Sequence, residues 1–249
     1  MGEQTLPSPA PLIEAVGASV QNAASRGIAV ADIHWQVAAG EYWVVGGGNG
    51  AGKSAFLGTL AGLYPTAAGV VRHFGREFSK LSEEEAIAQR ARIGFVFKGG
   101  GRFFHELTVA ENVALPLRYH RDWSEAEAAD SVKALLEATG LTSLADANAH
   151  SLTTGWQLRA GLARALALQP EVLFLDEPMA GLEPSHCQWW RDFLGQLSQG
   201  ALCTQGRKIT LIAATNDFTF WSGIRCHFAL IKDGRWQSLG ERDQIPETN

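Results

Sequence analysis

A glycine-rich segment ending in a lysine and a serine is the clearest chemical feature of the chain: Gly47-Gly48-Asn49-Gly50-Ala51-Gly52-Lys53-Ser54. Glycines allow backbone N–H groups to turn inwards and approach an anion closely. Lys53 can reach the β- and γ-phosphates of a nucleoside triphosphate, and the Ser54 hydroxyl can ligate Mg²⁺. The segment predicts a phosphate-binding loop (P-loop). The alternative is a glycine-rich turn that contains a lysine by chance.

The residues around the P-loop support phosphate binding. Residues 42–45 are a short apolar strand before it, and residues 54–63 have a helical pattern after it. A helix that begins near Lys53 points its unpaired N–H groups and the positive end of its dipole at the same anion. The order of strand, loop and helix therefore favours a functional site over chance.

Two carboxylates follow a second apolar stretch, Val172-Leu173-Phe174-Leu175-Asp176-Glu177. In a parallel sheet, ligands bind at the carboxyl ends of the strands. Asp176 can hold Mg²⁺ through water, and Glu177 can polarise an attacking water as a general base. An apolar strand that ends in two acids is a weak signal by itself, and it gains weight from the P-loop upstream.

The composition limits the classes of protein to consider. The chain has 249 residues, of which 46% are hydrophobic, enough for the core of one large or two small domains. A net charge of −5 argues against a broad nucleic-acid-binding surface. The sequence has no run of about 18 apolar residues, so it predicts no membrane-spanning helix. Residues 1–11 are expected to form a flexible, proline-rich lead-in rather than a signal peptide. We therefore expect a cytoplasmic protein.

Hydrophobic patterns predict an alternation of strands and helices. Capping boxes at Ser82 and Ser124 mark two helix starts, and Asp233-Gly234 marks the turn of a hairpin. Residues 108–168 are predicted to be almost wholly helical. Strands are predicted at 12–20, 28–37, 42–45, 69–74, 93–97, 172–175 and 209–214, the hairpin at 228–231 and 235–239, and a helix at 184–198. This alternation predicts an α/β fold with a mostly parallel, helix-covered sheet and a helical insertion.

Over nearly its whole length the chain resembles the nucleotide-binding subunits of ABC transporters. The P-loop matches the Walker A motif of that family, residues 172–176 match Walker B, and Glu177 falls on its catalytic glutamate. Residues 180–183 fall on the D-loop, with glutamate in place of the usual aspartate. Residues 152–159, Leu-Thr-Thr-Gly-Trp-Gln-Leu-Arg, fall on the signature motif L-S-G-G-Q. The order and spacing of these motifs make the resemblance specific.

The resemblance implies a P-loop ATPase fold in one domain over residues 12–249. Such a domain has a RecA-like α/β core, an N-terminal antiparallel β region and an inserted helical subdomain, here at about 98–168. It implies that the residues from Gly47 to Ala55 bind Mg-ATP, with Ser54 and Asp176 as the metal ligands.

The resemblance also implies partners. Members of the family close head-to-tail on a second subunit, and here this implies a dimer in which Thr153 and Gly155 of one copy complete the site of the other. Closure is expected to drive a separate transmembrane permease, which would hold the subunit at the inner face of the cell membrane.

A narrower resemblance lies at residues 95–120, FVFKGGGRFFHELTVAENVALPLRYH. The ATPases of bacterial phospholipid transporters that work with MCE (mammalian cell entry) proteins carry a similar stretch, with counterparts of Asn112-Val113-Ala114 and Pro116-Leu117-Arg118. This resemblance implies a lipid cargo and an MCE-domain protein as a further partner. Other lipid and lipoprotein exporters share parts of the stretch.

Two departures from the family pattern concern hydrolysis. Lys98 replaces the glutamine of the Q-loop, and an ammonium group cannot ligate a metal ion. Lys98 either forms a salt bridge with the γ-phosphate or turns out to solvent. Asn216 stands where the family has its switch histidine. Its amide can donate a hydrogen bond to the γ-phosphate, but it cannot carry a positive charge or shuttle a proton.

Two further departures concern the partner site and the base. Thr154 places a β-branched side chain where the signature motif has glycine, which makes close approach to a phosphate harder. Residues 15–27 contain no aromatic side chain that could stack on adenine, so the base is expected to pack on Val20, more weakly than on a ring.

Together these patterns predict an ATP-hydrolysing subunit of an ABC transporter with a weakened catalytic site. The alternative is a degenerate subunit that binds ATP, hydrolyses it poorly and acts as a structural or regulatory switch. Glu177 argues against this alternative, whereas Lys98 and Asn216 argue for it. A third interpretation, an ABC protein of translation or DNA repair, is disfavoured because the sequence has neither a tandem cassette nor a zinc-bearing insertion.

Overall fold

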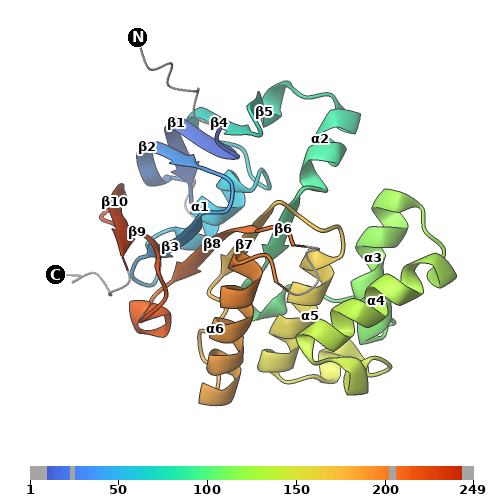
Figure 1. Ribbon diagram of the computed structural model, residues 1–249. Helices are drawn as coiled ribbons and strands as arrows, with labels where there is room; N and C mark the ends of the chain where they lie inside the picture. The colour runs from blue at the N-terminus through green and yellow to red at the C-terminus, as the bar shows by residue number, and fades with distance from the viewer. Residues whose placement is uncertain (1–9, 23–25, 202–205, 243–249) are drawn as a thin grey trace, which may run out of the picture.

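A single curled sheet runs through the molecule (Figure 1). The computed structural model describes residues 10–22, 26–201 and 206–242, and within these ranges the sheet has ten strands. They are β1 (Ile13–Gln21), β2 (Ile28–Val37), β3 (Tyr42–Gly46), β4 (Ala68–His73), β5 (Arg76–Glu77), β6 (Ile93–Val96), β7 (Val172–Asp176), β8 (Thr210–Thr215), β9 (Cys226–Lys232) and β10 (Arg235–Arg242). Their order across the sheet is β5-β4-β1-β2-β10-β9-β3-β8-β7-β6. Residues 1–9 of the predicted lead-in lie outside the described residues.

Five strands, β9, β3, β8, β7 and β6, form the parallel part of the sheet. β3 pairs in parallel with β8 and β9, and β7 pairs in parallel with β6 and β8. Every residue of β3, β7 and β8 is buried, as is typical of parallel strands with both faces covered. Their carboxyl ends meet at one edge of the sheet, where ligands bind in folds of this class. The predicted parallel α/β core is confirmed.

The antiparallel part of the sheet is built around β1. This strand pairs antiparallel with β2 and β4, and β10 pairs antiparallel with β9 in the predicted hairpin. The regular alternation of β1 is broken by register shifts after Ala15, so that Ala18, Ser19 and Val20 are buried in succession. The predicted N-terminal antiparallel region is therefore present, but the direction of its side chains does not follow a simple period of two.

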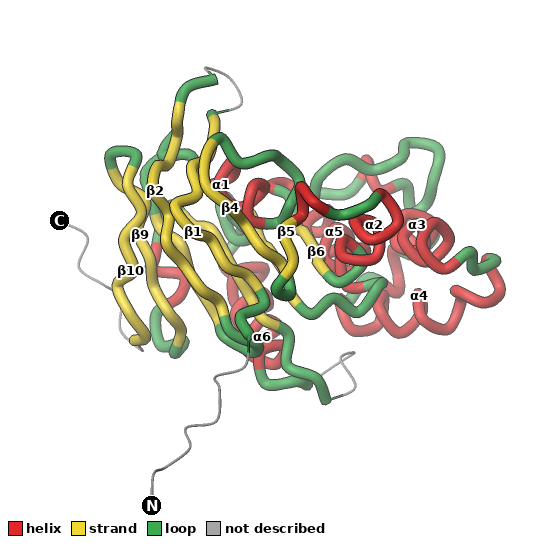
Figure 2. Tube along the Cα trace, turned by 90° about the horizontal axis from the view of Figure 1, so that it is seen from above, coloured by secondary structure: helices red, strands yellow, loops and turns green. Residues whose placement is uncertain are grey.

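Two apolar cores lie on opposite faces of the parallel strands. Neighbouring residues in a strand alternate between them: Val45 and Phe174 join the core under α1, while Val44 and Leu175 join the core under α3, α4, α5 and α6. The helices are α1 (Lys53–Leu60), α2 (Glu83–Arg90), α3 (Val109–Arg121), α4 (Glu125–Thr139), α5 (Thr154–Leu166) and α6 (Pro184–Ser198). Figure 2 shows α3, α4 and α5 grouped on one side of the molecule, away from β1, β2 and β10.

The region predicted to be almost wholly helical, 108–168, divides into α3, α4 and α5. Residues 140–153 hold only two short 3₁₀ helices, Thr142–Leu144 and Ala149–Ser151, and the prediction is wrong for the rest of this segment. α4 ends where Gly140 adopts a left-handed conformation, with φ of 70°. Further on, the Asn148 side chain accepts a hydrogen bond from the backbone of His150 and donates one to the carbonyl of His105. Side-chain hydrogen bonds of this kind compete with helix formation.

The local helix signals in the sequence are otherwise accurate. The predicted capping boxes at Ser82 and Ser124 are both formed, and Thr108 forms a third at the start of α3. α6 has the predicted bounds, with Pro184 in its first turn. In the part of the chain that the structure describes, no helix is long and apolar enough to cross a membrane.

Candidate functional site

The P-loop connects the end of β3 to the start of α1. Gly52 has φ of 94°, and a Cβ at that position would lie 2.9 Å from the Cβ of Ala29. A Cβ on Gly47 would lie 2.8 Å from the backbone oxygen of Ile231. Neither position has room for a larger residue, which keeps the loop backbone accessible. The N-terminus of α1 has no side-chain cap, so its first N–H groups are suited to an anion.

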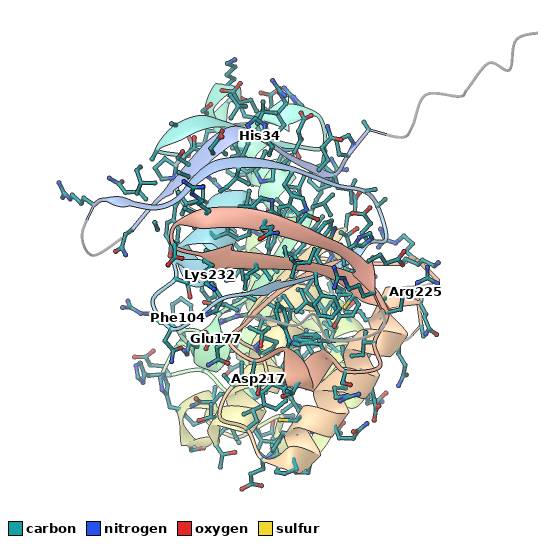
Figure 3. All side chains as sticks on the ribbon, turned by 90° about the vertical axis from the view of Figure 1, so that its left-hand side faces the viewer. His34, Phe104, Glu177, Asp217, Arg225 and Lys232 are labelled. Atoms are coloured by element: carbon teal, nitrogen blue, oxygen red, sulfur yellow. The ribbon has the colours of Figure 1, made fainter. Side chains whose placement is uncertain are left out.

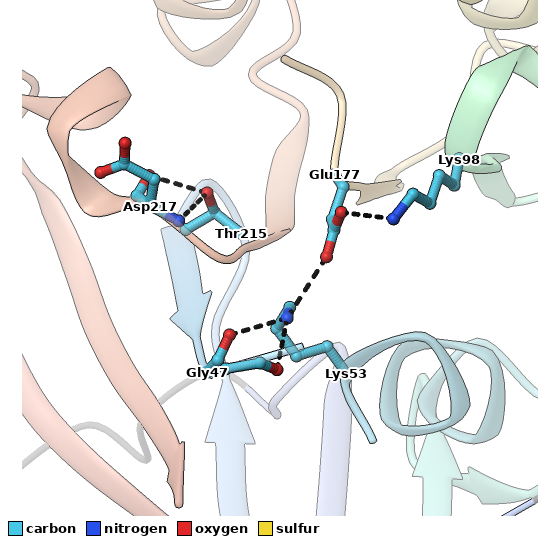
Figure 4. A network of polar contacts seen from close by, with 7 residues as sticks. Gly47, Lys53, Lys98, Glu177, Thr215 and Asp217 are labelled. Atoms are coloured by element: carbon cyan, nitrogen blue, oxygen red, sulfur yellow. Dashed lines mark hydrogen bonds and ion pairs between the residues drawn. The ribbon is translucent and has the colours of Figure 1, made fainter. Parts of the chain in front are cut away.

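The Lys53 ammonium group lies inside the P-loop and is only 4% exposed. Its Nζ donates to the carbonyl oxygens of Gly47 at 2.7 Å and Gly48 at 3.0 Å. It also lies 3.2 Å from Oε1 of Glu177 (Figure 4). These three acceptors match the three donors of an ammonium group. Lys53 is thus held by the residues around the place where the sequence predicts phosphates.

Glu177 directly follows β7 and adopts a left-handed conformation, with φ of 50°. Its side chain is 6% exposed, and each carboxylate oxygen meets a lysine: Oε1 faces Lys53 and Oε2 accepts a hydrogen bond from Lys98 at 2.7 Å (Figure 4). Burial by itself raises the pKa of the Glu177 carboxyl, but the hydrogen bonds and charges of Lys98 and Lys53 outweigh burial and lower the pKa. The Glu177 carboxylate is therefore ionised and held between two cations.

The structure gives Lys98 a partner other than the two predicted from the sequence, which were the γ-phosphate and solvent. It lies at the start of the turn that follows β6, and 62% of its side chain is exposed. Its ammonium group nevertheless reaches the buried carboxylate of Glu177. The hydrogen bond to Glu177 is the largest cause that raises the pKa of Lys98, so Lys98 stays charged.

Asp176 and Ser54 lie together at the ends of β7 and the P-loop. Burial raises the pKa of the Asp176 carboxyl, while a hydrogen bond with the Ser54 side chain opposes this shift. Oδ1 of Asp176 is buried and has no hydrogen-bond partner. A free carboxylate oxygen beside a hydroxyl suits a hard cation such as Mg²⁺. Among the described residues, no group of three or more His, Cys, Asp or Glu could hold a metal ion by itself.

A cavity of about 980 Å³ opens beside the P-loop. Residues 46–51 line it, together with the turn 216–219 after β8 and Lys232 at the end of β9 (Figure 3). Ile28, which is 56% exposed, also lines this cavity. The sequence reasoning missed Ile28, Asp217 and Lys232. The last two follow or end strands parallel to β3, so the rule that ligands bind at the carboxyl ends of parallel strands could have found them.

Asn216 lies on the wall of this cavity, in the turn after β8. The hydroxyl of Thr215 donates to the carbonyl of Asp217 at 2.8 Å and accepts from its backbone N–H at 3.1 Å (Figure 4). These two bonds fix the turn on both sides of Asn216, whose side chain is exposed. Its predicted contact with a γ-phosphate stays a prediction.

The expectation that a base packs on Val20 needs correction. Val20 is fully buried in the core under α1 and is not part of the cavity wall. The register shifts in β1 turn its side chain towards the core. An aliphatic surface for a base is offered instead by Ile28, at the start of the neighbouring strand β2.

Thr153, Thr154 and Gly155 lie at the start of α5 and do not line the cavity beside the P-loop. Thr153 is the N-cap residue of α5, and both threonines are exposed. Gly155 is buried against His186 of α6, where a Cβ would lie 2.8 Å from the imidazole ring. The structure of one chain thus leaves Thr153 accessible to a second molecule, and the contribution of Thr153 and Gly155 to a partner's site stays a prediction.

Comparison with known proteins agrees with this geometry. Residues 30–180 match the family model for ABC transporters. The chain is 37% identical, over 74% of its length, to the methionine import ATP-binding protein MetN 2 of Paraburkholderia xenovorans, of which it covers 47%. It spans about half to two thirds of the length of the curated relatives it matches.

Solved structures share the fold. cbiO1 from Clostridium perfringens, part of the ABC transporter complex cbiONQ, matches with a TM-score of 0.75 and 26% identity, covering 92% of this chain and 87% of that one. The dimeric, post-hydrolysis ATP-binding cassette MJ0796, bound to ADP and Pi, matches with a TM-score of 0.78 and 23% identity, covering 94% and 100%. The chain therefore belongs to the ABC transporter family, whereas the narrower resemblance to phospholipid transporters stays a prediction.

Proposed function

We propose that this member of the ABC transporter family binds Mg-ATP at its P-loop and hydrolyses it, as the ATP-binding subunit of a membrane transporter. The observation that carries the proposal is the meeting of Lys53 and Glu177, 3.2 Å apart, beside Ser54 and Asp176. A buried cation, a general base and two oxygen ligands for a metal at one helix N-terminus are the groups that phosphoryl transfer to water needs.

The residues of the site have separable roles in this proposal. Lys53 exchanges its carbonyl and carboxylate partners for the β- and γ-phosphates of ATP. Ser54 and Asp176 would hold Mg²⁺, which when bound neutralises charge on the transferring phosphoryl group. Glu177 orients the attacking water and accepts its proton. Asn216 can donate a neutral hydrogen bond from the cavity wall.

The proposed transporter also contains a second copy of this chain and a transmembrane permease. The exposed Thr153 at the start of α5 supports a role in the site of a partner subunit, as the family resemblance implies. MJ0796 is described as a dimer and cbiO1 as part of a transporter complex, which supports the same assembly here. The permease would hold this chain at the inner face of the membrane.

The identity of the transported cargo is the most specific part of the proposal. The segment 95–120 supports a lipid, moved together with an MCE-domain protein, whereas MetN 2 is named for methionine import. Purification of the tagged chain from detergent-extracted membranes distinguishes the two. A co-purifying MCE-domain protein with bound phospholipid supports lipid transport, and a permease with a soluble solute-binding protein opposes it.

A subunit that binds ATP and hydrolyses it poorly is the second candidate function. It is favoured by the two lysines that occupy both oxygens of Glu177.

Measurements of Mg-ATP binding and of steady-state phosphate release, on the chain alone and with its co-purified permease, test the main proposal and separate the two candidates. Glu177→Gln should abolish phosphate release and retain binding. If neither sample binds ATP, both candidates are wrong. If ATP binds and the native complex releases phosphate no faster than Glu177→Gln, the second candidate is correct.

A further inference from the structure

We propose that Lys98 is a positioning residue that locks Glu177, and that it must withdraw before Glu177 can act on water. This inference rests on the proposed function, in which Glu177 is the general base. In this inference, a residue of the chain itself regulates the activity of Glu177, and no other protein has to enter the site.

The lock consists of two ion pairs on one buried carboxylate. Oε1 of Glu177 lies 3.2 Å from the ammonium of Lys53, and Oε2 lies 2.7 Å from that of Lys98. A general base must form a hydrogen bond to the water whose proton it takes. Each oxygen of this carboxylate, whose side chain is 6% exposed, carries a cation that competes with water and weakens the oxygen as a base.

The two lysines are released by different events. Lys53 belongs to the P-loop, and the phosphates of an incoming nucleotide compete with Glu177 for its ammonium group. Lys98 is 62% exposed and lies outside the P-loop, in the turn after β6. The phosphates therefore displace the contact to Oε1 through the P-loop, while the contact to Oε2 is lost only when Lys98 leaves the carboxylate.

The turn that carries Lys98 is attached to the helical side of the molecule. Gly100 packs so closely on α5 that a Cβ on Gly161 would lie 2.7 Å from its carbonyl oxygen. Arg164 of α5 donates to the carbonyl of Arg102 at 2.7 Å. Glu177, in contrast, follows β7, a buried strand of the parallel part of the sheet. The ion pair between Lys98 and Glu177 thus links α5 to β7, and a shift of α5 relative to the sheet opens it.

The kinetic test compares substitutions of Lys98 in the full-length chain. Lys98→Met removes the charge and keeps an unbranched side chain of similar length, so we expect kcat for phosphate release to rise about tenfold or more with little change in KM for ATP. Lys98→Arg keeps the cation and should give a much smaller rise. The matched control is Lys80→Met, because Lys80 is likewise an exposed lysine paired with a glutamate, Glu77, at 2.8 Å. It should leave kcat unchanged.

A second measurement needs no nucleotide. In a double-mutant cycle on thermal unfolding, Lys98→Met should lower Tm by about 2–4 °C in the native background and by much less in the Glu177→Gln background. Equal losses in both backgrounds would overturn the ion pair and the lock with it.

The outcomes separate the lock from the proposed function. If native protein hydrolyses ATP and Lys98→Met is equally fast or slower, the lock is wrong and the proposed function stands. If no variant binds Mg-ATP, the proposed function fails, and the lock fails with it even where the unfolding cycle shows coupling. A rise in kcat with Lys98→Met, reversed by Lys98→Arg, together with coupling in the unfolding cycle, supports the lock.

Discussion

Nζ of Lys98 lies 2.7 Å from Oε2 of Glu177, although 79 positions separate the two residues in the chain. The pair joins the turn after β6 to the residue that follows β7, two neighbouring parallel strands. It places a cation on the carboxylate that the P-loop lysine contacts from the other side. The expected behaviour of the site follows largely from this arrangement.

We expect ATP binding to depend on Lys53. Lys53→Ala removes the buried ammonium that the P-loop directs at the phosphates, a charge-assisted contact of about 1.5–3 kcal/mol. The Kd for Mg-ATP measured by calorimetry should rise roughly tenfold or more. Lys80→Ala, on the exposed surface, is the control and should bind like the native chain. An unchanged Kd for Lys53→Ala would mean that the nucleotide binds elsewhere.

We expect weak discrimination between ATP and GTP. Val20 is buried, and the aliphatic Ile28 is the exposed apolar side chain on the cavity wall. Stacking on an aromatic ring would add about 0.5–1.5 kcal/mol, but Phe218, the aromatic residue on this wall, is buried, with 7% exposed. GTP should therefore compete with ATP within about one order of magnitude in a displacement assay. A much stronger preference for ATP would show that another residue holds the base.

We expect slow hydrolysis that substitutions at two positions accelerate. Lys98→Gln together with Asn216→His restores the side chains of the family pattern, removes the cation from Glu177 and adds a group that can shuttle a proton. The kcat of the complex with its permease should rise, whereas Glu177→Gln in the native background should abolish activity, since loss of a general base typically costs about 10²–10⁴-fold. Steady-state phosphate release measures both. If the native complex hydrolyses ATP rapidly and the double substitution lowers kcat, then Lys98 and Asn216 are effective replacements for glutamine and histidine.

We expect one surface carboxylate to make stability depend on pH in the acid range. A hydrogen bond from Arg76, followed by the backbone N–H of Ser82, lowers the pKa of Glu85 from its usual 4.5 to about 2. Because the folded-state pKa is the lower one, Glu85 stabilises the fold above pH 4.5, and this contribution is lost as the pH falls to about 2. The Tm of Glu85→Gln should be below that of the native chain at pH 7.

The two proteins should become equally stable only below pH 2, where the carboxyl of Glu85 is protonated in the folded and unfolded states alike. Arg76→Ala removes the main cause of the low pKa and should weaken the pH dependence. The effect on Tm is expected to be small because the pair is exposed to solvent. If Tm of the native chain and of Glu85→Gln differed by the same amount at neutral and at acid pH, the ionised Glu85 carboxylate would not be the cause of the difference.

The sequence by itself determined the features that depend on neighbouring residues. The capping boxes at Ser82 and Ser124 are made by side chains three positions from the backbone groups they bind, so they are visible in the sequence. The same holds for the P-loop, whose glycines, Lys53 and Ser54 belong to one short segment. The apolar run before Asp176 predicts a strand buried on both faces, which is what β7 is.

Only the tertiary structure decided the contacts between distant segments. The position of Lys98 depends on the packing of its turn against α5 and on the pairing of β6 with β7, neither of which a local pattern encodes. Val20 illustrates the same limit, because register shifts set by pairing with β2 and β4 determine which face of β1 it occupies. Side-chain direction in a strand follows a period of two only while the register is regular, and the register is fixed by the partner strands.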